Sequence, residues 1–179
     1  MFAGQRYFIR KPIALIGFMG AGKTSVAKLL EKHTGIKSVD TDQLVVQQTK
    51  QTVSEIINNR GIDEFRRIEA KVISDLIEHE KCIIATGGGI VESAVARGVL
   101  KNCYCVWLKV DAKNSEKRIE DFSARPMFKD VENAANLIEK RSEFYEQYSD
   151  ASVNTNNKSL SNVVKEVRDC LVKAGVLQY

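Results

Sequence analysis

Histidine and cysteine are too sparse and too poorly spaced in this 179-residue chain to build a metal site or a disulfide framework. The two histidines are isolated, and Cys103 and Cys105 have no second Cys/His pair with ligand spacing. Cys82 lies beside an apolar run as these two do, and Cys170 falls in a helical pattern. We therefore expect free, mostly buried thiols of a reducing compartment.

Long apolar and long basic runs are also missing. No apolar stretch approaches the ~20 residues of a membrane-spanning helix, and residues 1–11 lack an apolar core of signal-peptide length. The net charge of +4 is spread along the chain, which suits a small anionic substrate and gives no reason to expect a nucleic-acid partner. No repeat or linker interrupts the sequence. We expect one cytoplasmic domain over residues 1–179 that acts as a monomer without a membrane partner.

Residues 17–24 read GFMGAGKT, which is the spacing of a phosphate-binding P-loop. An apolar strand pattern at 13–16 precedes the loop, and an amphipathic helix pattern at 25–32 follows it. Glycines and a helix N-terminus together present backbone N–H groups to an anion. A glycine-rich turn without a ligand is the alternative, but the flanks favour a nucleoside triphosphate site. Its predicted binding residues are Gly20, Ala21, Gly22, Lys23, Thr24 and Ser25, with Lys23 at the β- and γ-phosphates and the Thr24 hydroxyl on Mg²⁺.

Strand and helix patterns alternate along the rest of the chain. This alternation predicts an α/β fold in which helices cover both faces of a parallel sheet. Expected strands lie at 13–16, 36–40, 82–85, 104–110 and near 152–153. Expected helices cover 25–32, a stretch from about 43, 52–60 with a capping box, 63–80, 92–100, 114–121, 131–148 and 160–174.

Two groups of residues follow predicted strands, where ligands bind in open α/β sheets. Asp40 and Asp42 are two apart on a segment that we expect to be extended, so both should project to one side while Thr41 faces away. One acid could hold Mg²⁺ through water, and the other could accept a substrate hydroxyl proton. The alternative is a pair of solvated acids that cap the next helix. The second group is Thr86 with three glycines at 87–89, which would bring backbone N–H groups against a substrate.

Three arginines fit the needs of a kinase for an acidic metabolite. Arg66 has Glu69 one helical turn on, and Arg141 precedes the aromatic pair at 144–145. Both could grip a carboxylate by two hydrogen bonds. Arg125 falls in an aperiodic stretch at 122–130 that could form a lid, from which it would neutralise the transferring phosphoryl group.

In order and spacing, these motifs make the chain resemble the shikimate kinase family, small P-loop enzymes of the nucleoside-monophosphate-kinase type. The resemblance spans about residues 13–167. It rests on the P-loop, Asp-Thr-Asp at 40–42, Phe-Arg-Arg-Ile-Glu at 65–69, Thr-Gly-Gly-Gly at 86–89, Arg-Pro at 125–126, and Arg141 with Tyr145. It implies a three-layer fold with a five-stranded parallel sheet in the order 2-3-1-4-5, substrate-binding helices at about 41–80 and a mobile lid at about 115–130.

The resemblance also implies an activity, which is ATP-dependent phosphorylation of the 3-hydroxyl of shikimate with one Mg²⁺ per chain. By the same likeness, Lys23, Asp42 and Arg125 are catalytic, Thr24 and Asp40 serve the metal, and Arg118 and Arg125 contact the nucleotide. The implied shikimate-binding residues are Asp42, Arg66, Gly88 and Arg141, and the turn at 155–157 looks like the family's adenine loop.

One departure from the family pattern falls close to these residues, because Ile62 follows Gly61 where the family usually has glutamate. Two other functions stay open. A related kinase for gluconate or a nucleoside monophosphate would share the P-loop, and a non-catalytic relative would share the fold.

Overall fold

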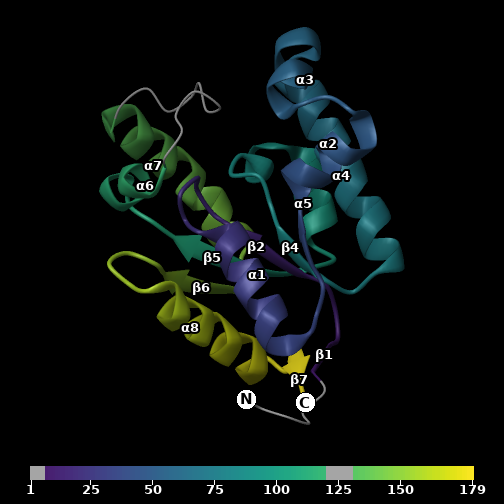
Figure 1. Cartoon of the computed structure of the whole chain (residues 1–179). Coiled ribbons are helices and arrows are strands. Elements are labelled where there is room, and N and C mark those ends of the chain that lie inside the picture. Colours follow the sequence, from purple (N-terminus) through teal and green to yellow (C-terminus); the bar gives the residue numbers. More distant parts are fainter. Residues whose placement is uncertain (1–6, 120–130) are drawn as a thin grey trace.

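A five-stranded parallel sheet forms the centre of the computed structural model, which describes residues 7–119 and 131–179 (Figure 1). Its strands lie in the order β3-β4-β2-β5-β6. Numbered without the short β1, this is the expected order 2-3-1-4-5. The bounds are β2 Ile13–Ile16, β3 Ser38–Asp40, β4 Ile83–Ala85, β5 Tyr104–Lys109 and β6 Ala151–Asn154.

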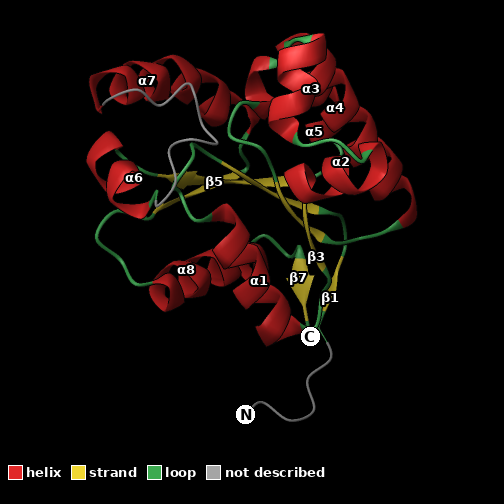
Figure 2. Ribbon diagram, turned by 45° about the horizontal axis from the view of Figure 1, so that its top comes forward, coloured by secondary structure: helices red, strands yellow, loops and turns green. Residues whose placement is uncertain are grey.

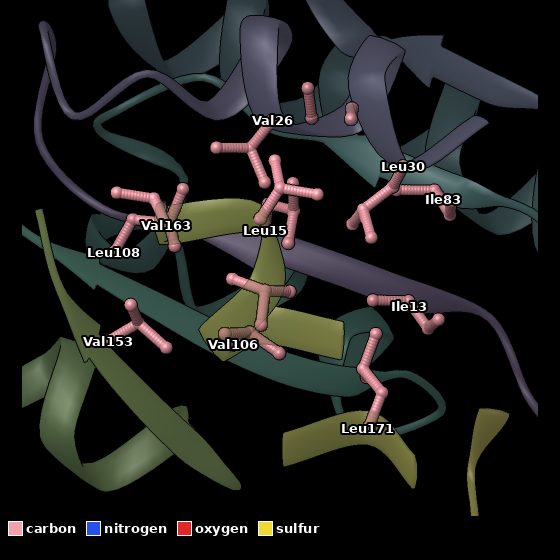
Figure 3. Packing of buried hydrophobic residues seen from close by; sticks show 14 of the residues in the cluster. Ile13, Leu15, Val26, Leu30, Ile83, Val106, Leu108, Val153, Val163 and Leu171 are labelled. Atoms are coloured by element: carbon pink, nitrogen blue, oxygen red, sulfur yellow. The ribbon is translucent and has the colours of Figure 1, made fainter. Parts of the chain in front are cut away.

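The central strand β2 explains why helices cover both faces of the sheet. All four of its residues are buried, and they alternate between two hydrophobic cores. Ile13 and Leu15 pack on the side of α1 (Lys23–Thr34) and α8 (Leu160–Lys173). Figure 3 shows Val26 and Leu30 of α1 pointing toward these strand residues. The expected three-layer α/β architecture is confirmed.

The opposite face of the sheet carries three further helices, as Figure 2 shows. These are α4 (Ile62–His79), α5 (Ala94–Leu100) and α7 (Val131–Tyr148). Two shorter helices, α2 (Thr41–Thr49) and α3 (Val53–Arg60), pack with α4 around a small core of their own. The expected capping box is present, since Thr52 and Glu55 each accept from the other's backbone N–H. The helices from 41 to 79 thus form a subdomain beyond the carboxyl end of β3.

Some element bounds differ from those expected. The helix predicted over 92–100 begins later, as α5, because the Ser93 side chain caps it by accepting from the Ala96 N–H. Glu92 belongs instead to a 3₁₀ turn, η1 (Ile90–Glu92). The helix predicted at 114–121 is α6 (Ala112–Arg118), with Asp111 as its cap. The part of the expected lid from 120 to 130 lies outside the described residues, and with it Arg125.

A two-stranded antiparallel pair joins the ends of the described chain. β1 (Phe8–Ile9) lies beside β7 (Leu177–Gln178), and the Tyr7 and Tyr179 rings meet edge to face at 5.8 Å. Sequence reasoning missed both strands because two residues are too few to show a period. None of the described helices combines the length and the apolar character that a membrane crossing requires.

Candidate active site

The P-loop lies between the end of β2 and the start of α1, as its sequence predicts. Gly22, the residue before α1, has φ 89°, and a Cβ there would project into open space. Glycine is therefore needed at this position for its backbone angle and not for lack of room. Gly22 also has no side chain that could cap the helix. The start of α1 therefore has no side-chain cap from this residue, and the helix dipole favours an anion there.

Lys23 holds its ammonium group against the P-loop itself. The Nζ atom donates to the carbonyl oxygens of Gly17 at 2.7 Å and Phe18 at 2.9 Å, and the residue is only 9% exposed. A positive charge is thus fixed beside the backbone amides of the loop. This arrangement suits the binding of phosphate groups, which carry the opposite charge.

One oxygen of the Asp40 carboxylate caps the next helix, which was one of the two alternatives from the sequence, and the other oxygen reaches the P-loop. Oδ2 accepts from the Thr24 hydroxyl at 2.7 Å, whereas Oδ1 accepts from the N–H groups of Asp42 and Gln43 and so caps α2. The carboxylate therefore joins the P-loop to the carboxyl end of β3. The Thr24 hydroxyl and the Asp40 carboxylate thus come together here, and both are groups of the kind that Mg²⁺ prefers.

The expectation of an extended Asp-Thr-Asp segment is wrong. The cap made by Asp40 starts α2 at Thr41, so Asp42 stands in the first turn of a helix. Thr41 does not face away. It is fully buried, and its hydroxyl accepts from the Gly87 N–H at 3.1 Å and donates to Glu69 at 3.3 Å. A Cβ on Gly87 would lie 3.3 Å from Oδ1 of Asp42, so this carboxylate faces the turn formed by the three glycines at 87–89, the glycine turn.

Arg66 and Glu69 form the predicted ion pair within α4, with 2.7 Å between Nη1 and Oε2. Glu69 is completely buried. Burial raises the pKa of the Glu69 carboxyl, and the neighbouring Arg66 guanidinium acts in the opposite direction. Nε of Arg66 is buried without a hydrogen-bond partner, which leaves one donor of this guanidinium to be satisfied.

Arg141 approaches the same place from α7. Its guanidinium donates from Nε and Nη2 to the two carboxylate oxygens of Glu92, at 3.0 and 2.8 Å. A Cβ built on Gly89 would lie 2.0 Å from Nη2 of Arg66 and 2.9 Å from Oε2 of Glu92. The two arginines, predicted to act together although they are 75 positions apart in the sequence, therefore converge at Gly89.

The glycine turn also adjoins the P-loop. A Cβ on Gly88 would lie 3.3 Å from the backbone nitrogen of Met19 and 3.5 Å from the Gly17 carbonyl oxygen. Tyr145 also holds the turn, because its hydroxyl donates to the Gly88 carbonyl oxygen and its ring stacks on Trp107 at 5.6 Å. Burial raises the pKa of Tyr145, which keeps this donor protonated. The glycine turn therefore connects the P-loop with the place where Arg66 and Arg141 approach each other.

Arg118 joins the P-loop to the turn after β6. Its guanidinium donates to the carbonyl oxygen of Gly20 at 3.3 Å and to the hydroxyl and carbonyl oxygens of Thr155 at 3.0 and 2.5 Å. Arg118, which was expected to contact the nucleotide, and the turn expected as the adenine loop are therefore in contact. Thr155 directly follows β6, which lies at the edge of the sheet opposite β3.

Comparisons with known proteins show which family the chain is similar to. The family model described as shikimate kinase matches residues 19–172. A shikimate kinase from Dehalococcoides mccartyi is 37% identical over 164 residues, which cover 90% of this chain and 93% of the relative. The chain belongs to the shikimate kinase family.

Solved structures give the same result for the fold. The structure of a shikimate kinase from Acinetobacter baumannii in complex with shikimate has a TM-score of 0.86 and 25% identity, and the match covers 92% of this chain and 94% of that one. A gluconokinase from Sinorhizobium meliloti has a TM-score of 0.64, 16% identity and 95% coverage of both chains, a likeness of fold alone. Membership of the shikimate kinase family thus separates this chain from the gluconate kinase considered above.

Three features around the site escaped sequence reasoning, namely Glu92 as the partner of Arg141, the buried hydroxyl of Thr41, and the bond from Tyr145 to Gly88. Each depends on a contact between residues more than 40 positions apart. Glu92 follows the glycine turn by only three residues, but a single sequence contains no signal that pairs it with Arg141. Ile62, which stands where the family usually has glutamate, is the first residue of α4. It is 40% exposed and lies on the surface of the subdomain.

Proposed function

We propose that this protein transfers the γ-phosphoryl group of ATP to the 3-hydroxyl of shikimate, giving shikimate 3-phosphate and ADP. The observation that carries the proposal is the convergence at the glycine turn. Gly88 lies against the P-loop, and Gly89 lies close to both Arg66 and the Glu92 carboxylate that Arg141 holds. A phosphate cradle next to two guanidinium groups suits a donor triphosphate and an acceptor with a carboxylate.

On the nucleotide side, residues 20–25 cradle the phosphates through backbone N–H groups. Lys23 supplies positive charge to the β- and γ-phosphates, and Arg118 stacks on the adenine ring near Thr155. Stabilising the charge that spreads over the transferred group is the main task of a phosphoryl-transfer enzyme. Arg125 is expected to add a second positive charge, and this role remains a prediction because the residue lies outside the described ranges.

The residues near Thr24 fit one magnesium ion. Mg²⁺ usually takes one or two oxygen ligands from the protein and the others from water and substrate phosphates, and the Thr24 hydroxyl and the Asp40 carboxylate meet that need. Within the described ranges no three acidic, histidine or cysteine side chains gather that could hold a metal ion by themselves. Bound there with ATP, the ion would neutralise charge on the β- and γ-phosphates.

On the acceptor side, Arg66 and Arg141 bind the carboxylate of shikimate, and the turn at Gly88 adds a backbone contact. The unpartnered Nε of Arg66 supports this role, since a buried donor gains most from a charged acceptor. Asp42 binds the reacting hydroxyl and accepts its proton or orients it toward the phosphate. All of these groups belong to one chain, so we propose that a monomer is sufficient for activity.

A coupled assay of ADP release tests the proposal. Purified protein with MgATP is offered shikimate, gluconate or a nucleoside monophosphate, and Lys23→Ala serves as the inactive control. Of the three acceptors, only shikimate is expected to cause rapid ADP release, and the control variant should release no ADP with any of them. Faster release with gluconate or the nucleotide would assign the protein to another acceptor.

A further inference from the structure

We propose that Glu92 is an internal competitor for the substrate carboxylate, because its own carboxylate occupies the side of Arg141 that an acidic substrate needs. The inference rests on the proposed function, specifically on Arg141 as a carboxylate-binding residue. It adds a residue that sets substrate affinity without contacting the phosphoryl group.

The contact between Glu92 and Arg141 has the geometry of the strongest Arg–carboxylate pairs. Both carboxylate oxygens are engaged, by Nε and Nη2 at 3.0 and 2.8 Å. The two partners differ in exposure, since the side chain of Arg141 is 3% exposed and that of Glu92 is 41% exposed. Arg141 is therefore the fixed partner, held in the packing of α7, and Glu92 is the partner that can rotate into solvent.

The position of the Glu92 carboxylate is the one that a bound carboxylate would take. Oε2 lies on the same side of Gly89 as Nη2 of Arg66, and each of these atoms is within 3 Å of the point where a Cβ would stand. Arg66 has in addition a buried Nε without a partner. A ligand that bridges Arg66 and Arg141 must enter this space, and it cannot do so while Glu92 remains there.

The exchange has a simple electrostatic consequence. A buried guanidinium is costly without a counter-charge, and Glu92 supplies one. When the carboxylate of an acidic substrate replaces that of Glu92, Arg141 gives up one ion pair for another, so the net gain on binding is reduced. Glu92 thereby lowers the affinity for carboxylate ligands in particular, whereas a neutral ligand gains nothing from its removal.

Glu92→Gln tests this idea because it removes the charge and keeps the size of the side chain. Shikimate, its neutral methyl ester and ATP are titrated by calorimetry, and the only tryptophan, Trp107, gives an optical signal beside the site. We expect the variant to bind shikimate about five-fold more tightly, the upper range for a partly exposed ion pair. The affinities for the ester and for ATP and the value of kcat should stay unchanged. Glu92→Ala should act in the same direction.

Glu143→Gln is the control for net charge, because it removes the same charge from an exposed position on α7. If it tightened shikimate binding as much as Glu92→Gln, the effect would come from the net charge of the protein, and the proposal would be overturned. Weaker or unchanged shikimate binding in both Glu92 variants would also overturn it, with Glu92 then serving to orient Arg141.

Arg141→Ala tests the underlying assumption independently. It should weaken shikimate binding, and Glu92→Gln should have no further effect in that background. Unchanged binding in Arg141→Ala alone would refute the carboxylate role of Arg141, and with it the acceptor side of the proposed function.

Discussion

Gly89→Ala should damage the acceptor site and leave the fold almost intact. The backbone of Gly89 has φ −95° and ψ 9°, which an alanine can adopt, so the substitution introduces no backbone strain. The added Cβ would stand 2.0 Å from Nη2 and 3.0 Å from Cζ of Arg66, and 2.9 Å from Oε2 of Glu92. All three atoms belong to side-chain ends that can move, so the effect should fall on the site.

The expected size follows from these distances. Non-bonded heavy atoms need about 3.5 Å, so the Arg66 guanidinium must shift by roughly 1.5 Å, too far to keep a hydrogen bond to a bound carboxylate. A hydrogen bond to a charged group contributes about 1.5–3 kcal/mol. Since about 1.4 kcal/mol corresponds to a factor of ten, the Kd for shikimate should rise roughly 10- to 150-fold. The Kd for ATP should not change.

Titration calorimetry with each substrate and urea unfolding measure the two sides of this prediction. Gly98→Ala is the matched control, because a Cβ on this helical glycine would have nothing within 4 Å, so the substitution should leave binding unaltered and stabilise α5 slightly. Shikimate binding within two-fold of wild type in Gly89→Ala would refute the reasoning. A loss of several kcal/mol in unfolding free energy would show that the substitution disrupts the turn and not only Arg66.

Three other substitutions or treatments follow from the same contacts. Asp42→Asn should keep ATP affinity and lower kcat by roughly 100-fold or more, since it removes the proton acceptor; near-normal turnover would exclude Asp42 from the reaction. Burial raises the pKa of Glu69, so the folded state holds this proton more tightly than the unfolded state and wild type should lose stability as the pH rises from acid toward neutral. Glu69→Gln should lack that part of the pH dependence in urea unfolding, and identical pH profiles would contradict the assignment. A thiol reagent should modify the partly exposed Cys170 first. Burial raises the pKa values of Cys82 and Cys103 to about 11 and about 12, so these two thiols should react only on unfolding. Equal modification rates for the three cysteines would be inconsistent with the buried core.

The sequence predicted those parts of the protein that depend on local pattern. The P-loop between Ile16 and Lys23, the capping box at Thr52 and the pair of Arg66 with Glu69 are set by spacings of a few residues, and all are present. The strand order came from the family resemblance. The alternation of strands and helices by itself indicates a parallel sheet and leaves the order of its strands undetermined.

The prediction failed where a contact or a cap overrides the local pattern. The segment from Asp40 to Asp42 was expected to be extended, but the Asp40 carboxylate caps α2, which begins at Thr41 and buries that residue. Glu92 was overlooked because its partner, Arg141, lies 49 positions away. Packing between distant elements decides such contacts, and a single sequence does not record it.

Phosphorus NMR of one reaction mixture tests the central claim, which is that the P-loop and the paired arginines serve one phosphoryl transfer. With protein, MgATP and shikimate, we predict that the ATP signals are replaced by those of ADP and of one phosphate monoester, and that omitting shikimate leaves ATP intact. Formation of inorganic phosphate in place of the monoester, at a rate that shikimate does not change, would contradict it.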